Sequence, residues 1–476
     1  MNVVVNAADV VIDDHLASDN SEAEFSVVTS SKLQVTDTVV KFHKVNQTEK
    51  SASDESISGL RVTFVNRYFY PDMSATSQML FDLARRLVKH GVEVNVVCSR
   101  QLYNDAHAKL SSFQTVEGIK VYRVATTLFG RSRLCGRALD YLSFYVTATQ
   151  KLLSLTSRGD ILVAKTDPPL ISLAVATVAK LKGARLVNWI QDLFPEVATH
   201  LGQPMPRWLG VTLESLRDLS LRMASANVVI GERMKCYVMQ RQVAAEKIHV
   251  VQNWADGQYL EPMPANSSVM RISLGLQKKF VVGYSGNLGR AHEFETILCA
   301  AQALRNEADV VFLMIGGGIN MQQLKTQVAL HKLGNFIFMP YQPRELLADS
   351  MAAADVHLIS LLPSLEGFIV PSKFYGILAT GRPAIVIGDT DGELARVIRR
   401  EKCGEAVRVG DWDALVSAIW LMKQEPEYRQ QLGARARTIF LGNYTADQGA
   451  RKWVELFVEL LRIDFEKRPG AVTVVA

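Results

Sequence analysis

Short apolar runs alternate with amphipathic helical stretches along most of this chain, and this rhythm constrains the fold more than any other feature. The run Leu60–Asn66 is rich in β-branched residues, as strands are. Apolar residues then recur at the spacing of one helical face: Leu80, Leu83, Ala84, Leu87 and Val88. Val92, Val94 and Val96 alternate with polar neighbours, which predicts the next strand. Such alternation predicts a parallel sheet covered by helices on both faces.

The alternation runs to residue 253, stops, and then restarts. In the first stretch, further strands are expected at 119–125, 161–164, 185–190, 227–231 and 249–253, with helices at 138–155, 172–182 and 207–224. In the second, strands are expected at 280–285, 309–315, 335–339, 355–360 and 384–387, followed by a helical region at 412–462. We therefore predict an α/β protein with two doubly wound Rossmann-like halves. Ligands of such sheets bind beyond the carboxyl ends of the strands, so the cleft between the halves is the expected site.

The predicted domain boundaries follow changes in composition. They are an acidic tail at 1–57, a first α/β domain at 58–253, a linker at 254–278, a second α/β domain at 279–443, and a C-terminal helix and tail at 444–476. The tail has ten acidic and four basic residues and buries too little to offset its ordering entropy. We expect it to be mostly disordered, although Val3–Val5 or Val39–Val40 would suit an added strand. Removing its charge of −6 from the total of +5 leaves +11 on the rest of the chain.

Composition excludes several classes of protein. The five cysteines have no metal-type or CxxC spacing, which favours a reduced, cytoplasmic chain. The first residues lack the basic and apolar regions of a secretory signal. No run reaches the roughly 18 apolar residues of a membrane span, and a net charge of +5 on 476 residues does not call for nucleic acid. The cysteines are Cys98, Cys135, Cys236, Cys299 and Cys403.

Two glycine-containing turns of the second half suit an anion. The sequence YSGNLGR, with Gly286, Asn287, Gly289 and Arg290, follows its first strand, where backbone N–H groups and a helix N-terminus can face a phosphate. Three glycines, Gly316–Gly318, follow the next strand and permit close backbone approach. Each turn is also compatible with an ordinary strand-to-helix connection. Neither has the dinucleotide fingerprint or the P-loop pattern.

A third segment, LEGFIVPSKFYGILATGRP, combines charges with a predicted helix start. Pro371 suits the first helical position, which places Ser372 and Lys373 at the positive end of the helix dipole. Glu366 lies just before this helix, within reach of ligand hydroxyls. Lys373 is equally compatible with a solvated helix cation, and Glu366 with a loop carboxylate.

Two loops of the first half lie at the expected ligand edge. One is the polar segment 66–78, and the other is NWIQDLFPE, in which Gln191 and Asp192 follow a strand. Asp192 is a candidate for a polar role in the cleft, with a helix cap or turn as the alternative.

Together these segments resemble the bacterial glycosyltransferases of family 4, which have the GT-B fold, over residues 60–463. The most specific motifs are YSGNLGRAHEFETI, LEGFIVPSKFYGILATGRP and NWIQDLFPE. The resemblance is closest to the branch that builds exopolysaccharide, O-antigen (lipopolysaccharide) and colanic-acid-type glycans. It implies transfer from a nucleoside-diphosphate sugar (UDP- or GDP-) with retention and without a metal. Asp389-Thr390-Asp391 spells a metal-binding motif but occupies a late loop.

The resemblance also implies residue roles. Arg290 and Lys373 would hold the diphosphate and stabilise the leaving group, Glu366 would bind donor sugar hydroxyls, and Asp192 would face the reacting carbon. The remaining implied donor-side residues are Gly286, Asn287, Gly289, Gly316, Gly317, Pro340, Tyr341, Val370, Pro371 and Ser372. The remaining implied acceptor-side residues are Tyr70, Ser74, Thr76 and Gln191.

This chain departs from the family pattern at two places. The usual second glutamate of E-x7-E is absent, since Phe374 stands there by counting and Gly376 by alignment on Gly381. Gln191 stands where many relatives have His, and it cannot act as a base.

Acceptor and location follow from the resemblance and from one basic segment. Relatives use polyprenyl-diphosphate-linked acceptors, which implies a cytoplasmic enzyme on the inner membrane face. The basic segment 131–137 runs into the apolar stretch Leu139–Val146, which suits an anionic lipid surface or a solvated turn before a core helix. Two other functions stay open: a nucleotide-sugar epimerase of the same fold, and an inactive subunit that supports a partner transferase.

Overall fold

The computed structural model describes residues 57–466 except 104, 106, 130–133, 204 and 258, and it leaves the side chains of 134, 135 and 463–466 undescribed. Two expectations fall largely outside this range. They are the acidic, mostly disordered tail, of which only Ile57 is described, and the arginines of the basic segment before residue 134.

Eight strands form the sheet of the first lobe, in the order β3-β4-β2-β1-β5-β6-β7-β8. Every pairing is parallel except β3 with β4. The strands are β1 Arg61–Val65, β2 Glu93–Ser99, β3 Phe113–Val116, β4 Ile119–Val124, β5 Ile161–Lys165, β6 Arg185–Trp189, β7 Ala226–Val229 and β8 Ile248–Val250. Its helices are α2 Ala75–Lys89, α3 Leu134–Leu155, α4 Ile171–Lys182, α5 Glu196–His200, α6 Arg207–Met223 and α7 Glu232–Gln240.

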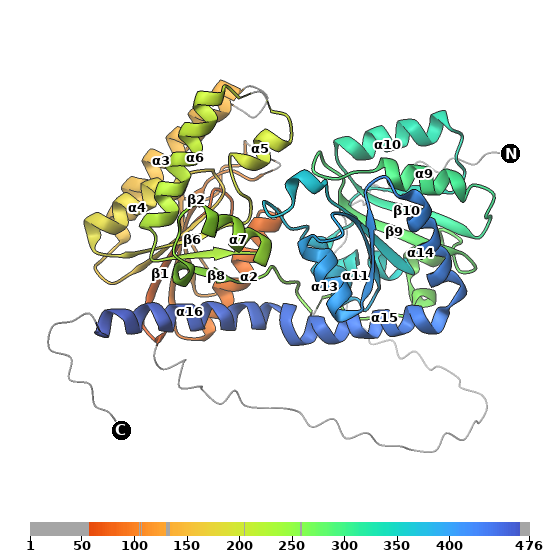
Figure 1. Cartoon of the computed structure of the whole chain (residues 1–476). Coiled ribbons are helices and arrows are strands. Elements are labelled where there is room, and N and C mark those ends of the chain that lie inside the picture. Colours follow the sequence, from red (N-terminus) through yellow and green to blue (C-terminus); the bar gives the residue numbers. More distant parts are fainter. Residues whose placement is uncertain are drawn as a thin grey trace, which may run out of the picture. The chain divides into compact units, whose positions relative to one another are not determined.

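Six strands, all parallel, form the sheet of the second lobe in the order β11-β10-β9-β12-β13-β14. They are β9 Phe280–Asn287, β10 Val310–Gly317, β11 Phe336–Met339, β12 Val356–Ser360, β13 Ala384–Gly388 and β14 Gly404–Arg408. The accompanying helices are α8 Val269–Ser273, α9 Glu295–Ala303, α10 Ile319–Leu330, α11 Leu347–Ala352, α12 Lys373–Ala379, α13 Glu393–Glu401, α14 Trp412–Gln424, α15 Pro426–Ile439 and α16 Ala446–Glu466 (Figure 1).

Helices cover both faces of the first sheet because its central strands bury side chains on both sides. On β1, Phe64 belongs to one apolar cluster and Val65 to another. Phe64 packs edge-on against Trp453 of α16, so the last described helix covers the sheet formed by the first strands (Figure 1). The prediction of two doubly wound α/β halves is confirmed.

The sequence does not predict two strands, β3 and β14, because both lie at sheet edges. The side chains of β3 are mostly exposed, and β3 is antiparallel to its neighbour. The strand β14 reads GEAVR and fully buries only Val407. Both lack the buried apolar run that marks a central parallel strand.

Candidate active site

Two glycines face each other where β9 and β10 end. Gly286 and Gly316 are paired in register and have φ angles of +125° and +124°, a region that strongly favours glycine. A Cβ on Gly316 would lie 2.2 Å from the Gly286 carbonyl oxygen, and one on Gly318 would lie 2.4 Å from that of Leu288. The two turns therefore approach each other closely with bare backbone, and we call them the glycine cradle.

Lys373 lies against this cradle. Its Cε would be 3.7 Å from a Cβ on Gly286, and its Nζ lies 3.8 Å from the Tyr284 ring centroid and donates to the Tyr284 hydroxyl. Burial lowers the Lys373 pKa to about 7. Among the described residues, no carboxylate pairs with this ammonium, so a bound anion would supply the missing counter-charge.

His292 also lies near the ammonium of Lys373. Burial, and then the charge of Lys373, lower the His292 pKa to about 3, so its imidazole is neutral at physiological pH. Its Nδ1 contacts the Ser360 carbonyl, which makes Nδ1 the protonated nitrogen. His292 lies within the motif YSGNLGRAHEFETI, but the sequence predicts no role for it. A single His in a polar turn does not indicate that it will lie near Lys373.

Arg290 is exposed, and among the described residues it has no hydrogen-bond or ion-pair partner. The neighbouring Asn287 side chain is exposed as well, and Gly289 is half-buried. Asn287 ends β9, and Gly289 and Arg290 lie in the turn between β9 and α9, as the sequence predicts.

Tyr341 lies on the other side of the cradle. A Cβ on Gly317 would be 3.0 Å from its ring, while 59% of the tyrosine is exposed. Pro340 is exposed beside it. The structure thus places Tyr341 against the cradle, where a flat ligand group can stack on it.

Glu366 caps a helix. Its Oε1 accepts a hydrogen bond of 2.6 Å from the Glu393 backbone N–H at the start of α13. Burial raises its pKa, and the capping bond opposes that rise. It lines a pocket together with Val370 and Pro371, and Ser372 is exposed next to them. One carboxylate oxygen therefore has a structural partner, and binding of sugar hydroxyls stays a prediction for the other.

The loops at this edge also contact the first lobe. Glu393 Oε2 accepts a hydrogen bond of 2.9 Å from the Arg233 backbone N–H at the start of α7. The Arg233 guanidinium forms ion pairs of 3.3 Å with the carboxylates of Asp389 and Asp391. The Leu193 N–H donates to the Phe368 carbonyl at 3.0 Å. The two aspartates that spell a metal-binding motif are therefore paired with arginine.

On the acceptor side, two predicted residues have local partners. Ser74 precedes α2, and its backbone N–H donates to Asp72 at 2.9 Å. Tyr70 stacks on Phe81 with ring centroids 4.8 Å apart and remains 41% exposed.

Lys165 lies near two further predicted residues, Thr76 and Asp192. It ends β5, is 1% exposed, and its Nζ donates to the Thr76 carbonyl at 2.9 Å and lies 3.7 Å from the Trp189 ring centroid. Burial lowers the pKa of Lys165 to about 7, although the nearby charges of Asp192 and Asp167 raise it. Sequence reasoning missed Lys165, although a lysine that closes the apolar run ILVA was the available signal.

Asp192 follows β6 with its side chain exposed. The side chain opens into a pocket that Lys165 and Leu193 also line, so protein surrounds the carboxylate although the pocket leaves it accessible. Desolvation by this surrounding protein, and then the charge of Asp167, raise the pKa of Asp192 to about 6, while Lys165 lowers it. Among the described residues no ion pair joins Lys165 to Asp192. The neighbouring Gln191 is buried and its Nε2 has no partner.

The two positions considered for the absent second glutamate differ in packing. Phe374 is fully buried in the apolar core, so it cannot touch a ligand. Gly376 is half-buried, and a Cβ there would meet Leu260 and Met351 at 3.6 Å. The ribose contact therefore stays unassigned.

Two family models match this chain. A glycosyl transferase 4-like domain matches residues 75–254, and the glycosyl transferases group 1 domain matches residues 268–439. The two matches correspond to the first and second lobes.

Curated relatives and a solved structure agree with this assignment. The chain is 27% identical over 271 residues to the probable glycosyltransferase WbjE of Pseudomonas aeruginosa, covering 56% of this chain and 67% of WbjE. It is 29% identical over 227 residues to the putative colanic acid biosynthesis glycosyl transferase WcaI of Escherichia coli, covering 46% of this chain and only 55% of WcaI. HepE of Anabaena, solved in complex with UDP and glucose, superposes with a TM-score of 0.63 at 15% identity over 84% of this chain and 100% of HepE. The fold is GT-B, as the resemblance implied.

Proposed function

We propose that this chain transfers a sugar from a nucleoside-diphosphate sugar to a glycan acceptor, because a glycosyl transferase 4-like domain matches its first lobe and a glycosyl transferases group 1 domain matches its second. The observation that carries this proposal is the Lys373 ammonium against the glycine cradle, where no carboxylate among the described residues pairs with it. Bare backbone beside a cation suits a diphosphate, and HepE was solved with UDP and glucose. The donor base, UDP or GDP, is part of the proposal.

The leaving group of this reaction is a nucleoside diphosphate, which gains negative charge as the glycosidic bond breaks. Lys373 and the unpaired Arg290 would stabilise that charge, the largest catalytic contribution expected at such a site. Tyr341 would stack on the base, and the free oxygen of Glu366 would accept from sugar hydroxyls. We further propose that configuration is retained and that no metal is required.

We propose the acceptor to be a polyprenyl-diphosphate-linked glycan in surface polysaccharide synthesis, since the name of WcaI refers to colanic acid. Asp192 and the 70–78 loop would face this acceptor. An enzyme with such an acceptor works at the cytoplasmic face of a membrane, and none of the described helices combines the length and hydropathy of a membrane span.

The test is a panel of UDP- and GDP-sugars with a lipid-linked acceptor, in which nucleotide release is followed. Release only with acceptor is expected. Sugar interconversion without acceptor would instead indicate an epimerase, and no release across the panel would favour an inactive subunit.

Lys373→Ala and Arg290→Ala should each lower turnover by orders of magnitude, because each removes a charge next to the leaving group. Arg305→Ala, at an exposed position of the same lobe, is the matched control and should keep full turnover. Near-normal rates in both site variants would contradict the diphosphate assignment.

A further inference from the structure

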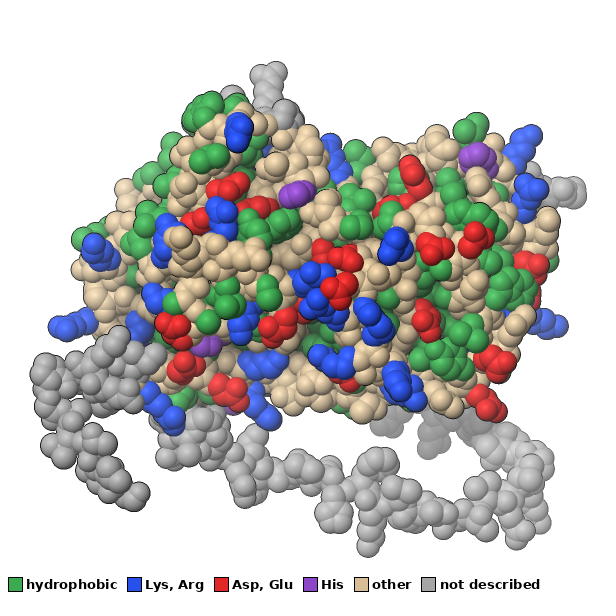
Figure 2. All heavy atoms as spheres, in the orientation of Figure 1, with side chains coloured by type: hydrophobic (Ala, Val, Ile, Leu, Met, Phe, Trp, Pro, Cys, Tyr) green, Lys and Arg blue, Asp and Glu red, His purple; other side chains and the backbone are tan. Residues whose placement is uncertain are grey.

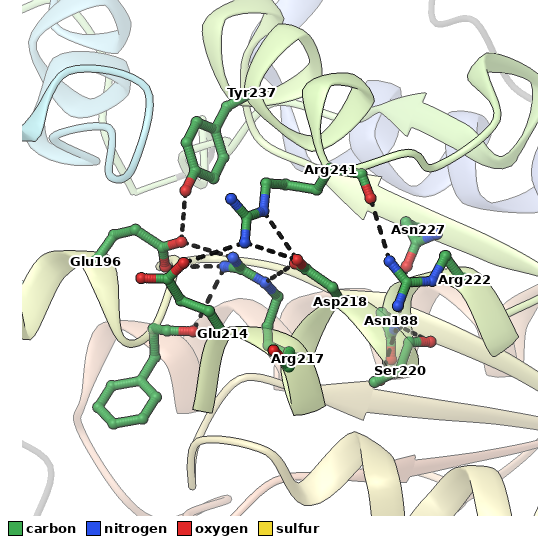
Figure 3. Close-up of polar contacts among 12 residues, drawn as sticks. Asn188, Glu196, Glu214, Arg217, Asp218, Ser220, Arg222, Asn227, Tyr237 and Arg241 are labelled. Atoms are coloured by element: carbon green, nitrogen blue, oxygen red, sulfur yellow. Dashed lines mark hydrogen bonds and ion pairs between the residues drawn. The ribbon is translucent and has the colours of Figure 1, made fainter. Parts of the chain in front are cut away.

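The buried side of α6 is charged. Arg217 donates to Glu196 at 2.6 and 2.9 Å and to Asp218 at 2.7 Å, and Asp218 accepts from Arg241 at 2.9 Å. Arg217 and Asp218 are each 7% exposed. Figure 3 shows these side chains converging between α6, α5 and α7, with Tyr237 donating to Glu196.

The exposed side of the same helix is largely apolar, with Thr212, Ser215 and Arg222 among the apolar residues. It presents five large apolar side chains, whose exposed fractions are 70% for Trp208, 57% for Val211, 37% for Leu216, 43% for Leu219 and 45% for Met223. A surface helix normally turns its apolar stripe to the core and its charges to water. In α6 this pattern is reversed, because charged side chains are buried and large apolar side chains are exposed. Its exposed side is therefore suited to an apolar environment rather than to water.

The apolar surface continues onto two neighbouring helices, since α6 contacts α4 and α4 contacts α3. In Figure 2, hydrophobic side chains gather over the upper left of the molecule, where Figure 1 places α3 and α6. We call this surface of α3, α4 and α6 the three-helix face. Its further exposed apolar residues are Leu139, Leu142 and Val146 of α3 and Leu181 of α4.

The charges on the three-helix face have one sign. Among its described side chains, the exposed charged ones are Lys180, Arg207 and Arg222, and none is acidic. The carboxylates of α6, Glu214 and Asp218, are paired with Arg241. An apolar surface whose fully exposed charged side chains are all cations matches the headgroup region of an anionic bilayer.

We propose that the three-helix face docks on an anionic lipid surface. Trp208 is suited to the headgroup boundary, where one end of its ring is apolar and the other is wet. A second copy of this chain is the less favourable occupant, because a symmetric dimer through this face would bring like cations together. The docking extends the lipid contact expected from residues 131–146 to a second and a third helix. It depends on neither donor nor acceptor.

The experiment is co-sedimentation of the full chain with vesicles of phosphatidylglycerol and phosphatidylethanolamine, compared with pure phosphatidylcholine. We expect binding to the anionic vesicles that weakens as salt is added. Arg207→Ser combined with Arg222→Ser should weaken it roughly 25-fold, about fivefold for each cation. Trp208→Ser combined with Leu219→Ser should weaken it at least tenfold, because the variant no longer buries these two large apolar side chains in the bilayer.

Leu330→Ser combined with Leu421→Ser is the matched control, since these leucines are 70% and 43% exposed on the second lobe, and it should bind as the unchanged chain does. Urea midpoints of all variants establish that the fold is kept. Failure of the unchanged chain to bind anionic vesicles, or equal binding by folded face variants, would overturn the proposal. So would a dimer in sedimentation velocity that the Trp208 and Leu219 double variant dissociates. No sugar enters these assays, so a negative result leaves the transfer proposal standing.

Discussion

Replacing Lys165 with Met tests whether the first lobe holds a desolvated charge beneath its candidate site. The ammonium has an ordinary pKa of 10.5 and a pKa of about 7 in the folded chain. Since one pKa unit corresponds to about 1.4 kcal/mol, carrying this charge costs the folded chain about 4 kcal/mol at pH 7 and about 2 kcal/mol at pH 9. Methionine has a similar length and no charge, so it removes this cost.

The sign of the effect follows from proton uptake. Between pH 7 and pH 10.5 the unfolded chain binds the Lys165 proton more fully than the folded chain does, so this residue makes stability rise with pH over that interval. The Met variant lacks this contribution. Its stability relative to the unchanged chain should therefore fall by about 2 kcal/mol from pH 7 to pH 9. The variant also loses the hydrogen bond to Thr76. This loss changes the free energy of unfolding equally at pH 7 and pH 9, so it cancels from the difference between them.

Urea unfolding at the two pH values measures this difference by linear extrapolation. Lys89→Met, which removes an exposed lysine, is the control and should show no such change. A stability difference for Lys165→Met that is the same at pH 7 and pH 9 would refute the reasoning, because it would mean that the buried ammonium is not desolvated.

Two other predictions follow from charges described above. Arg217→Met should lower the free energy of unfolding by about 3–5 kcal/mol, since it leaves the buried Glu196 carboxylate without its bidentate partner; urea titration measures this loss, and a loss under 1 kcal/mol would contradict it. Binding of UDP near pH 8 should take up protons, because a diphosphate raises the pKa of Lys373 from about 7. Calorimetry in two buffers of different ionisation enthalpy measures this uptake, and Lys373→Met should abolish it.

The fold was predictable from the sequence because parallel strands that are buried on both faces have an unmistakable composition. The run VVFLMI of β10 is apolar throughout, and no surface element would be. The edge strands β3 and β14 were not predictable, since β3 is mostly exposed and β14 fully buries only Val407, so neither has a buried apolar run.

The candidate site was predictable where backbone chemistry defines it. Gly316 is required by a close backbone approach that only glycine allows, and Gly286 by its φ angle of +125°. Both requirements are visible in the sequence as a glycine that follows a strand. Lys165 and His292 were not assigned roles, because what distinguishes them is burial beside other charges. The capping role of Glu366 depends on a helix that begins 27 residues later, and nothing local to Glu366 reveals it.

The return of α16 to the first lobe has a consequence for the order in which the chain acquires its structure. Trp453 and Phe457 belong to the same apolar cluster as Phe64 and Trp189, so about 390 residues of sequence separate the two sides of one core. A ribosome delivers the N-terminal side first. Part of the apolar face of the first sheet is therefore exposed to water until the second lobe and α16 have been synthesised. A chain built in this way completes its earliest domain last, and any truncation before α16 removes Trp453 and Phe457 from the core of that domain.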